Sequence, residues 1–243
     1  LSLSLKNEVD NTAFPPVFIP NPPTLANFAD VFRKNDFLQY TLNSIIVSFS
    51  ATGAALLIGV PAGYGIAKAR ATRAALLILI ARITPGLSYL IPLFLLFQWL
   101  EITGTLMPIV ITHLVITVPI VVWIMIGFFD EVPREIDEAA MIDGASRFTI
   151  YYRIILPLLR PAIVTVVIIK GVAIYNEFYI PFLYMPSRDL AVISTSLFRF
   201  TGPFGSQWEI IAAGTMIVIL PTMLLFVLLQ KWIYAGVAAG SVK

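Results

Sequence analysis

Five long apolar stretches constrain this chain more than any other feature of its sequence. Each is 23 to 28 residues long, and they cover residues 40–67, 74–100, 107–129, 161–184 and 210–234. At about 1.5 Å of rise per helical residue, each stretch exceeds the ~30 Å hydrocarbon core of a bilayer. Because 58% of all residues are hydrophobic and only 12% are charged, too little polar surface remains to cover a soluble globule. The sequence therefore predicts an all-α polytopic membrane helix bundle with five visible spans.

The distribution of basic residues predicts which side of the membrane each connection faces. Residues 101–106 contain no lysine or arginine, and residues 185–209 contain only two. By the positive-inside rule these two loops face outward, and the basic connections and the C-terminus are cytoplasmic. Residues 1–5 then lie outside and are expected to be the stub of a helix. The basic residues on the cytoplasmic side are Lys68, Arg70, Arg73, Arg134, Arg147, Arg153, Arg160, Lys231 and Lys243.

Several functions are excluded by what the sequence lacks. No cysteine is present, so thiol catalysis and cysteine-ligated metals are ruled out. The net charge of +2 gives no reason to expect a nucleic acid partner. There is no phosphate-loop pattern for ATP hydrolysis, and no paired acids or metal-ligand spacing that would indicate an intramembrane enzyme. We therefore predict no catalytic residues and no metal site.

Residues 6–38 are predicted to form an extracytoplasmic connector that carries a short surface helix. The proline-rich run at residues 14–23 forbids a helix and favours extended backbone. Thr24 can then cap a helix that places Leu25, Phe28 and Phe32 on one face. This helix either lies on the outer membrane surface or is simply a packed connector.

The longest charged connection, residues 130–160, carries a motif with fixed spacing. Its pattern is Glu-Ala-Ala-x3-Gly-x9-Ile-x-Leu-Pro, which fixes seven positions. It resembles the cytoplasmic coupling loop, or EAA loop, of permease subunits of bacterial ABC importers. The chain is similar to these subunits throughout, and most of all to the maltose-type (carbohydrate uptake) permease family. The coupling residues implied by the resemblance are Glu138, Ala139, Ala140, Asp143, Gly144, Ile154, Leu156 and Pro157.

The residues of this loop also predict its local structure. Pro133 suits the first turn of a helix, and acidic residues load the N-terminal half of that helix. Gly144 can adopt the left-handed conformation that ends it. Ser146 is expected to cap a second helix that Pro157 breaks. The prediction is a helix–turn–helix on the cytoplasmic face.

The resemblance implies a fold, a set of partners and a docking role. Residues 1–243 would form a single transmembrane permease domain of the type I ABC importer fold, with a sixth span upstream. The implied partners are a second permease in a heterodimer, two ATP-binding subunits that hold ATP and Mg, and an extracytoplasmic solute-binding protein. An apolar knob of Ile136, Ala140 and Met141 would seat in a cleft of an ATP-binding subunit. Glu138 would face a basic residue there.

Several charged or polar residues fall inside the predicted spans, where a charge at the helix centre costs about 2.5–3.5 kcal/mol. They should therefore face protein or water. Lys170 and Glu177 are seven residues apart, so a continuous helix would place them two turns apart on one face. The residues of this group are Arg82, His113, Lys170, Asn176 and Glu177.

Residues 175–181 resemble the aromatic-Asn-acid-Phe-x-x-Pro stretch of sugar-importer permeases. Because aromatic faces stack on sugar rings and amides bond hydroxyls, Tyr175, Asn176 and Tyr179 are candidate substrate-pathway residues. Glu177 and Lys170 are the remaining candidates. Polar contacts between helices explain these residues equally well. If Lys170 and Arg82 both face the pathway, an acidic sugar is the favoured cargo.

The predicted function is that of a permease subunit of an ATP-driven, binding-protein-dependent carbohydrate importer in the bacterial cytoplasmic (inner) membrane. The cargo would be a mono- or oligosaccharide, with an acidic one included, and the chain itself would bind no cofactor. One alternative is an ion-coupled secondary transporter, which needs mid-membrane carboxylates where only Glu177 is available. Another is an ABC importer of a non-sugar solute such as glycerol phosphate.

The predicted orientation can be tested with cysteines, because the chain has none of its own. In Arg147→Cys, we expect an impermeant thiol reagent to label the protein only after the cells are opened. In Ser187→Cys, we expect the same reagent to label intact cells. Labelling of position 147 from outside intact cells would overturn the orientation.

Overall fold

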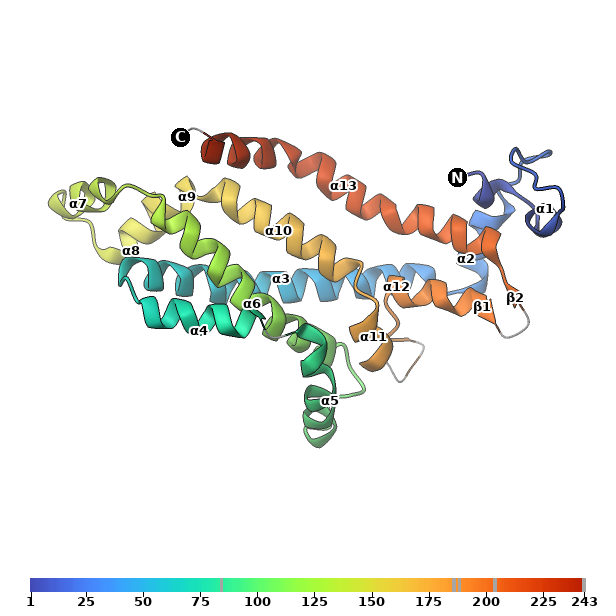
Figure 1. Ribbon diagram of the computed structural model, residues 1–243, viewed down its shortest axis with the longest axis horizontal. Coiled ribbons are helices and arrows are strands. Elements are labelled where there is room, and N and C mark those ends of the chain that lie inside the picture. Colours follow the sequence, from blue (N-terminus) through green and yellow to red (C-terminus); the bar gives the residue numbers. More distant parts are fainter. Residues whose placement is uncertain (84, 185–186, 188, 203–204, 242–243) are drawn as a thin grey trace. The chain divides into compact units, whose positions relative to one another are not determined.

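The computed structural model describes residues 1–83, 85–184, 187, 189–202 and 205–241 (Figure 1). Apart from one hairpin of two-residue strands, the elements within these ranges are helices. The N-terminal half contains η1 (Leu3–Leu5), α1 (Glu8–Thr12), α2 (Ala26–Lys34), α3 (Phe37–Lys68), α4 (Thr72–Ile83), η2 (Gly86–Tyr89), α5 (Leu90–Trp99) and α6 (Met107–Asp130). The C-terminal half contains α7 (Arg134–Ile142), α8 (Arg147–Thr149), the π-helix η3 (Ile150–Ile155), α9 (Leu156–Leu158), α10 (Arg160–Tyr175), α11 (Tyr179–Tyr184), α12 (Ile193–Ser196), η4 (Leu197–Phe200), β1 (Thr201–Gly202), β2 (Gly205–Ser206) and α13 (Trp208–Ser241).

The described helices account for the predicted spans. Three are long and apolar enough to cross a membrane, namely α3, α6 and the part of α13 from Trp208 to Gln230. Two bent helix pairs raise the number to five if each pair counts as one span. These are Thr72–Ile83 with Gly86–Trp99, and Arg147–Leu158 with Arg160–Tyr175. Five spans were predicted from hydropathy, and this upper number agrees in count, although the second pair covers residues 147–175 where the prediction placed a span at residues 161–184.

The described chain forms two compact units, each with its own apolar core. Unit 1 comprises Leu1–Ser48, Phe94–Ile109 and Val172–Val227. Unit 2 comprises Phe49–Leu93, Val110–Gly171 and Leu228–Lys243. The helices α3, α6, α10 and α13 each contribute residues to both.

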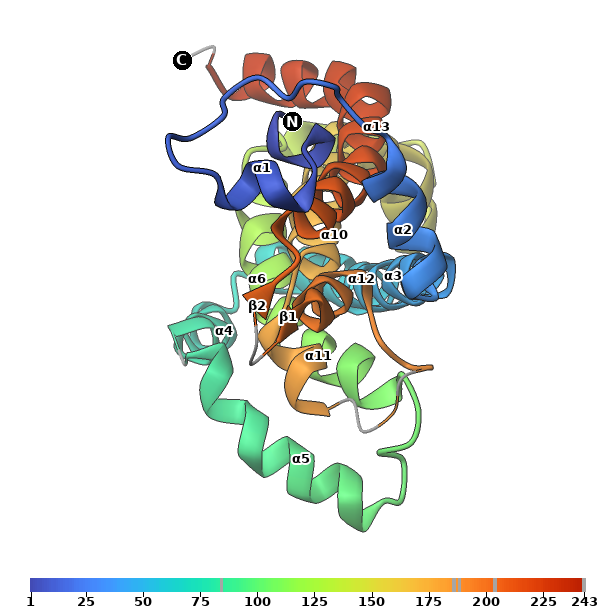
Figure 2. The same cartoon turned by 90° about the vertical axis from the view of Figure 1, so that its right-hand side faces the viewer.

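Unit 1 is held together by side chains that bond the backbone of irregular segments. Asn43 of α3 donates to the carbonyls of Asp189 and Ala191, each at 2.9 Å. Asn11 of α1 donates to the carboxylate of Glu209 at 2.8 Å, which ties the N-terminal segment to the first turn of α13 (Figure 2). The apolar core of this unit consists of Val31, Phe37, Tyr40, Tyr175, Ala191, Ile193, Phe200, Ile210, Ala213 and Val218.

The connector helix α2 forms as predicted, and its apolar face is divided, because Phe28 packs against the core of unit 1 while Phe32 stays half exposed. Asn27 and Val31 are buried, whereas Leu25 is 72% exposed and Phe32 is 53% exposed. Asn27 faces inward because its amide donates to the carbonyls of Ser4 and Lys6, at 2.9 and 2.8 Å. Leu25, just before α2, is therefore largely exposed, whereas the half-exposed Phe32 ring lies 5.5 Å from the ring of Phe37, measured between centroids.

The fourth predicted span, residues 161–184, is not one helix, because α10 ends at Tyr175 and α11 begins at Tyr179. Proline has no amide hydrogen, so Pro181 cannot bond the carbonyl of Glu177. The hydroxyl of Ser194 donates to that carbonyl instead, at 2.6 Å. The expectation that Lys170 and Glu177 share one continuous helix face is therefore wrong.

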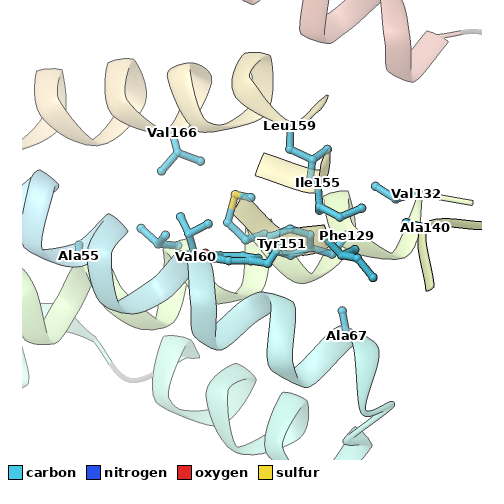
Figure 3. Packing of buried hydrophobic residues seen from close by; sticks show 13 residues of the cluster. Ala55, Val60, Ala67, Phe129, Val132, Ala140, Tyr151, Ile155, Leu159 and Val166 are labelled. Atoms are coloured by element: carbon cyan, nitrogen blue, oxygen red, sulfur yellow. The ribbon is translucent and has the colours of Figure 1, made fainter. Parts of the chain in front are cut away.

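Unit 2 is built on a close crossing of α3 and α6. Gly59 and Gly63 of α3 lie at the crossing, where a side chain at Gly59 would come within 2.7 Å of Val121. Their small size lets the backbones approach, as is common in membrane helix pairs. Figure 3 shows the core that results, with side chains from α3, α6, α7, η3 and α10.

Two glycines of α3 offer a matched test of this crossing. Gly59→Ala places a methyl group against the buried Val121, so we expect a loss of about 1–3 kcal/mol of stability. Gly53→Ala is the control, because nothing lies within 4 Å of the added carbon. The measurement is the thermal midpoint of the detergent-purified protein. Equal midpoints for the two variants would contradict the close crossing.

Candidate functional site

The first arm of the predicted helix–turn–helix is α7. It begins directly after Pro133, and Glu135 and Asp137 lie in its first turn, where the helix dipole favours negative charge. It ends at Ile142, and Gly144 two residues later turns the chain with a φ of 81°, a left-handed conformation that costs glycine little. The amide of Gly144 donates to the carbonyl of Met141 at 3.0 Å, and the amide of Ala145 donates to the carbonyl of Ala140 at 2.9 Å. The predicted glycine-terminated helix is confirmed.

The second arm follows at once. The side chain of Ser146 accepts a bond from the amide of Thr149 at 3.2 Å, so the predicted cap is confirmed. The helical segment continues through Pro157 to Leu158, which corrects the prediction that Pro157 breaks it. The break lies at Leu159, where the helix axis bends by 67°. Pro161, two residues further along the chain, has no amide hydrogen to continue the hydrogen bonds of the preceding helix.

The motif residues divide between two faces of this loop. Glu138, Ala139, Asp143 and Gly144 are exposed, whereas Ala140 is only 8% exposed. The predicted knob is therefore corrected. Ala140 and Ile136 point toward the protein's own core, and the exposed apolar side chains are Met141, Ile142, Phe148 and Tyr152.

The second half of the motif packs inward. Ile154 and Leu156 are partly buried against the core of unit 2, and Pro157 is half-buried beside them. Tyr151 and Ile155, between and beside these motif positions, are fully part of that core (Figure 3). The Ile-x-Leu-Pro segment thus attaches the loop to the membrane helices, while Glu138, Ala139 and Gly144 of the first half lie on the exposed surface.

A joint between α3 and the loop was not predicted from the sequence. The ring of Tyr64 lies 5.3 Å from the ring of Phe129 and 4.7 Å from that of Tyr151, measured between centroids. The amine of Lys68 lies 5.8 Å from the Tyr64 ring centroid and forms an ion pair with Asp137. Lys68 is the last residue of α3, but no sequence signal pairs it with an aspartate 69 positions away.

Four of the five candidate pathway residues surround the helix break in unit 1. Tyr175 is buried in the core, and its hydroxyl has no partner among the described residues. The exposed Asn176 donates to the carbonyl of Val172 at 2.9 Å. The carboxylate of Glu177 accepts from the amide of Tyr179 at 2.8 Å and so begins α11, while the Tyr179 ring is 64% exposed.

An aromatic cluster beside this break was also missed in the sequence. The ring of Phe178 lies 5.1 Å from that of Phe182 and 5.9 Å from that of Phe198, and the last two are about half exposed. The sequence places Phe198 in a distant loop, so its pattern could not show the cluster. The Tyr179 ring joins this cluster, 5.7 Å from that of Phe178.

The fifth candidate, Lys170, lies on α10 in unit 2 and is partly buried. It forms no ion pair among the described residues. Within the same described part of the chain, no group of three or more His, Cys, Asp or Glu residues could hold a metal ion.

Residues 55–239 match the family of binding-protein-dependent transport system inner membrane components. The chain belongs to this family. It is accordingly a multi-pass membrane component of a transport system and not an enzyme. The match includes the entire helix–turn–helix and the helix break at residues 176–178.

Several curated permeases align with almost the whole chain. The sulfoquinovosyl glycerol transport system permease protein SmoH of Agrobacterium fabrum is 29% identical over all of this chain and 86% of its own length. The arabinooligosaccharides transport system permease protein AraQ of Halalkalibacterium halodurans is 29% identical over 93% of this chain and 82% of its own. The inner membrane ABC transporter permease protein YcjP of Escherichia coli is 27% identical over 100% of this chain and 89% of its own length.

Solved structures show the fold. A chain of a bacterial ABC transporter involved in import of the acidic polysaccharide alginate superposes with a TM-score of 0.81 at 18% identity, over 96% of this chain and 88% of that chain. A chain of the MetNI methionine ABC transporter superposes with a TM-score of 0.68 at 15% identity, over 82% of this chain and 95% of that chain. The fold is that of type I ABC importer permeases.

The turn at Gly144 can be tested by adding a single methyl group. Gly144→Ala forces a left-handed conformation on a residue with a side chain, at a cost of about 1–2 kcal/mol. We expect the two arms to change their angle and the activity of the assembled transporter to fall. Gly127→Ala on α6 is the control, since its added carbon also meets nothing within 4 Å and its backbone is helical. Full uptake by Gly144→Ala would show that the turn is not required.

Proposed function

We propose that this chain is the permease subunit of an ATP-driven, binding-protein-dependent importer of a carbohydrate. The observation that carries the proposal is the exposed Glu138-Ala139 face of α7, held outward by a loop whose other side is buried. A nine-residue helix with one side packed and one side bare is suited to enter a groove on another protein. In this proposal the groove belongs to an ATP-binding subunit.

The energy comes from these partner subunits, which bind ATP and Mg. Closure of two ATP-binding subunits draws their docked loops together, and the membrane helices respond by alternating access. A second permease subunit, in a heterodimer with this chain, encloses the pathway, and an extracytoplasmic solute-binding protein delivers the solute. The loop and the C-terminus face the cytoplasm in the inner membrane, as the basic residues predict.

Carbohydrate is the proposed cargo for two reasons. Named relatives that align along the chain carry sugar derivatives, namely sulfoquinovosyl glycerol and arabinooligosaccharides. In unit 1, the exposed rings of Tyr179, Phe182 and Phe198 can stack on sugar rings, and the exposed Asn176 carries an amide of the kind that bonds sugar hydroxyls. The partly buried amine of Lys170 favours an acidic sugar within this class.

The docking proposal is tested by reversing one charge on its exposed face. In Glu138→Lys, we expect uptake and solute-stimulated ATPase activity to fall together by about tenfold or more, equal to ~1.4 kcal/mol. Membrane insertion should not change, because no membrane helix is altered. Glu131→Lys is the matched control, since Glu131 is exposed in the same loop but lies outside α7.

The assay uses the chain co-purified with its natural partners in proteoliposomes, with neutral and acidic saccharides and glycerol phosphate as solutes. Wild-type uptake by Glu138→Lys would remove α7 as the docking element. Uptake that follows an ion gradient without ATP would point to a secondary transporter. If glycerol phosphate alone stimulated the ATPase activity, the cargo would be glycerol phosphate and not a carbohydrate.

A further inference from the structure

The docking helix α7 touches the rest of its own chain on the side opposite Glu138. Ala140 is buried in the core of unit 2, and Ile136 packs against that core. Asp137 lies on the same inner side, and its side chain is only 14% exposed. A force applied to α7 by a partner therefore has to reach the membrane helices through these inward residues.

Two kinds of contact leave this inner side. The apolar one passes from Ala140 into a cluster that includes Tyr151 and Phe129. The polar one is the ion pair from Asp137 to Lys68, at the last residue of α3. Among the described residues only one other ion pair exists, Lys34 with Asp30, and it joins successive turns of a single helix. Of the two ion pairs in the described part of the chain, Lys68–Asp137 is thus the one that links segments distant in sequence.

The surroundings of the pair restrict its movement. The amine of Lys68 lies 5.8 Å from the centroid of the Tyr64 ring, within the range of a cation–π contact. That ring in turn contacts Phe129 and Tyr151 on α6 and η3. The second carboxylate oxygen of Asp137 is buried with no described partner, so Lys68 is the group that compensates its charge.

We propose that the Lys68–Asp137 pair is the positioning contact that makes α3 follow α7 when an ATP-binding subunit moves the loop. The Tyr64 ring orients the lysine and joins the same movement to α6. This inference rests on the proposed docking function of α7. It assigns to Lys68 and Asp137 a role in energy coupling that is separate from holding the fold.

The test compares single and double neutral substitutions in the complete transporter in proteoliposomes. Lys68→Met or Asp137→Asn alone leaves one partly buried charge unpaired, so reduced assembly is expected from either a structural or a coupling role. The double variant, Lys68→Met with Asp137→Asn, leaves no unpaired charge and should restore assembly. The decisive readout is the number of solute molecules transported per ATP hydrolysed by the assembled double variant.

We expect the double variant to hydrolyse ATP but to transport about five- to tenfold fewer molecules per ATP than wild type. Lys34→Met, which breaks the other described ion pair, is the control and should keep the wild-type ratio. A wild-type ratio in the double variant overturns the proposal. Failure of the double variant to assemble also overturns it, because the pair would then be needed for folding. If the wild-type complex itself shows no ATP-driven uptake, the proposed function fails and not this contact alone.

Discussion

A carbonyl group inside a bilayer has no water to bond, so each interruption of a membrane helix must find a partner within the protein. This constraint decides where the chain is irregular. Pro181 removes the bond to the Glu177 carbonyl, and Ser194 from a distant segment replaces it at 2.6 Å. Asn43 also bonds two carbonyls of the loop before α12. Unit 1 therefore depends on a few polar side chains that bond carbonyls outside the regular helices, and the aromatic cluster lies beside one of these breaks.

Helix α7 likewise depends on contacts with the rest of the protein. A helix of nine residues is marginal alone in water, since most helical stability in proteins comes from packing one face. Here Ala140, Ile136 and Asp137 supply that face, and alanine at position 140 lets the backbone of α7 lie close to the core. The exposed side can then carry residues that contribute nothing to the protein's own fold. The exposure of Glu138 is thus a consequence of what is buried behind it.

Hydropathy and turn chemistry made the spans and the loop predictable, because both depend on residues close in sequence. Gly144 and Ser146 act on amides within three positions of themselves, so their roles could be read directly. The joint of Tyr64, Lys68 and Asp137 could not, since its partners are brought together only by the crossing of α3 with α6. The inward turn of Ala140 escaped prediction for the same reason. Pro181 by itself indicates a bend in its span, but the full break at residues 176–178 involves a compensating bond from Ser194, a residue that no local pattern connects to Pro181.

The two halves of the loop motif can now be assigned different physical tasks. Of the nine residues between Gly144 and Ile154, the seven from Arg147 to Arg153 are helical and rise about 10 Å, enough to carry the chain from the exposed turn back to the core. Part of this stretch is the π-helix η3, whose wider turn places Ile150 and Ile155, five positions apart, together in that core. The second arm is therefore a strut, a rigid helical segment that is exposed where it begins at Arg147 and buried where it reaches Ile155. Because the strut and α7 meet at Gly144, the angle of that single turn determines how the exposed face of α7 is presented.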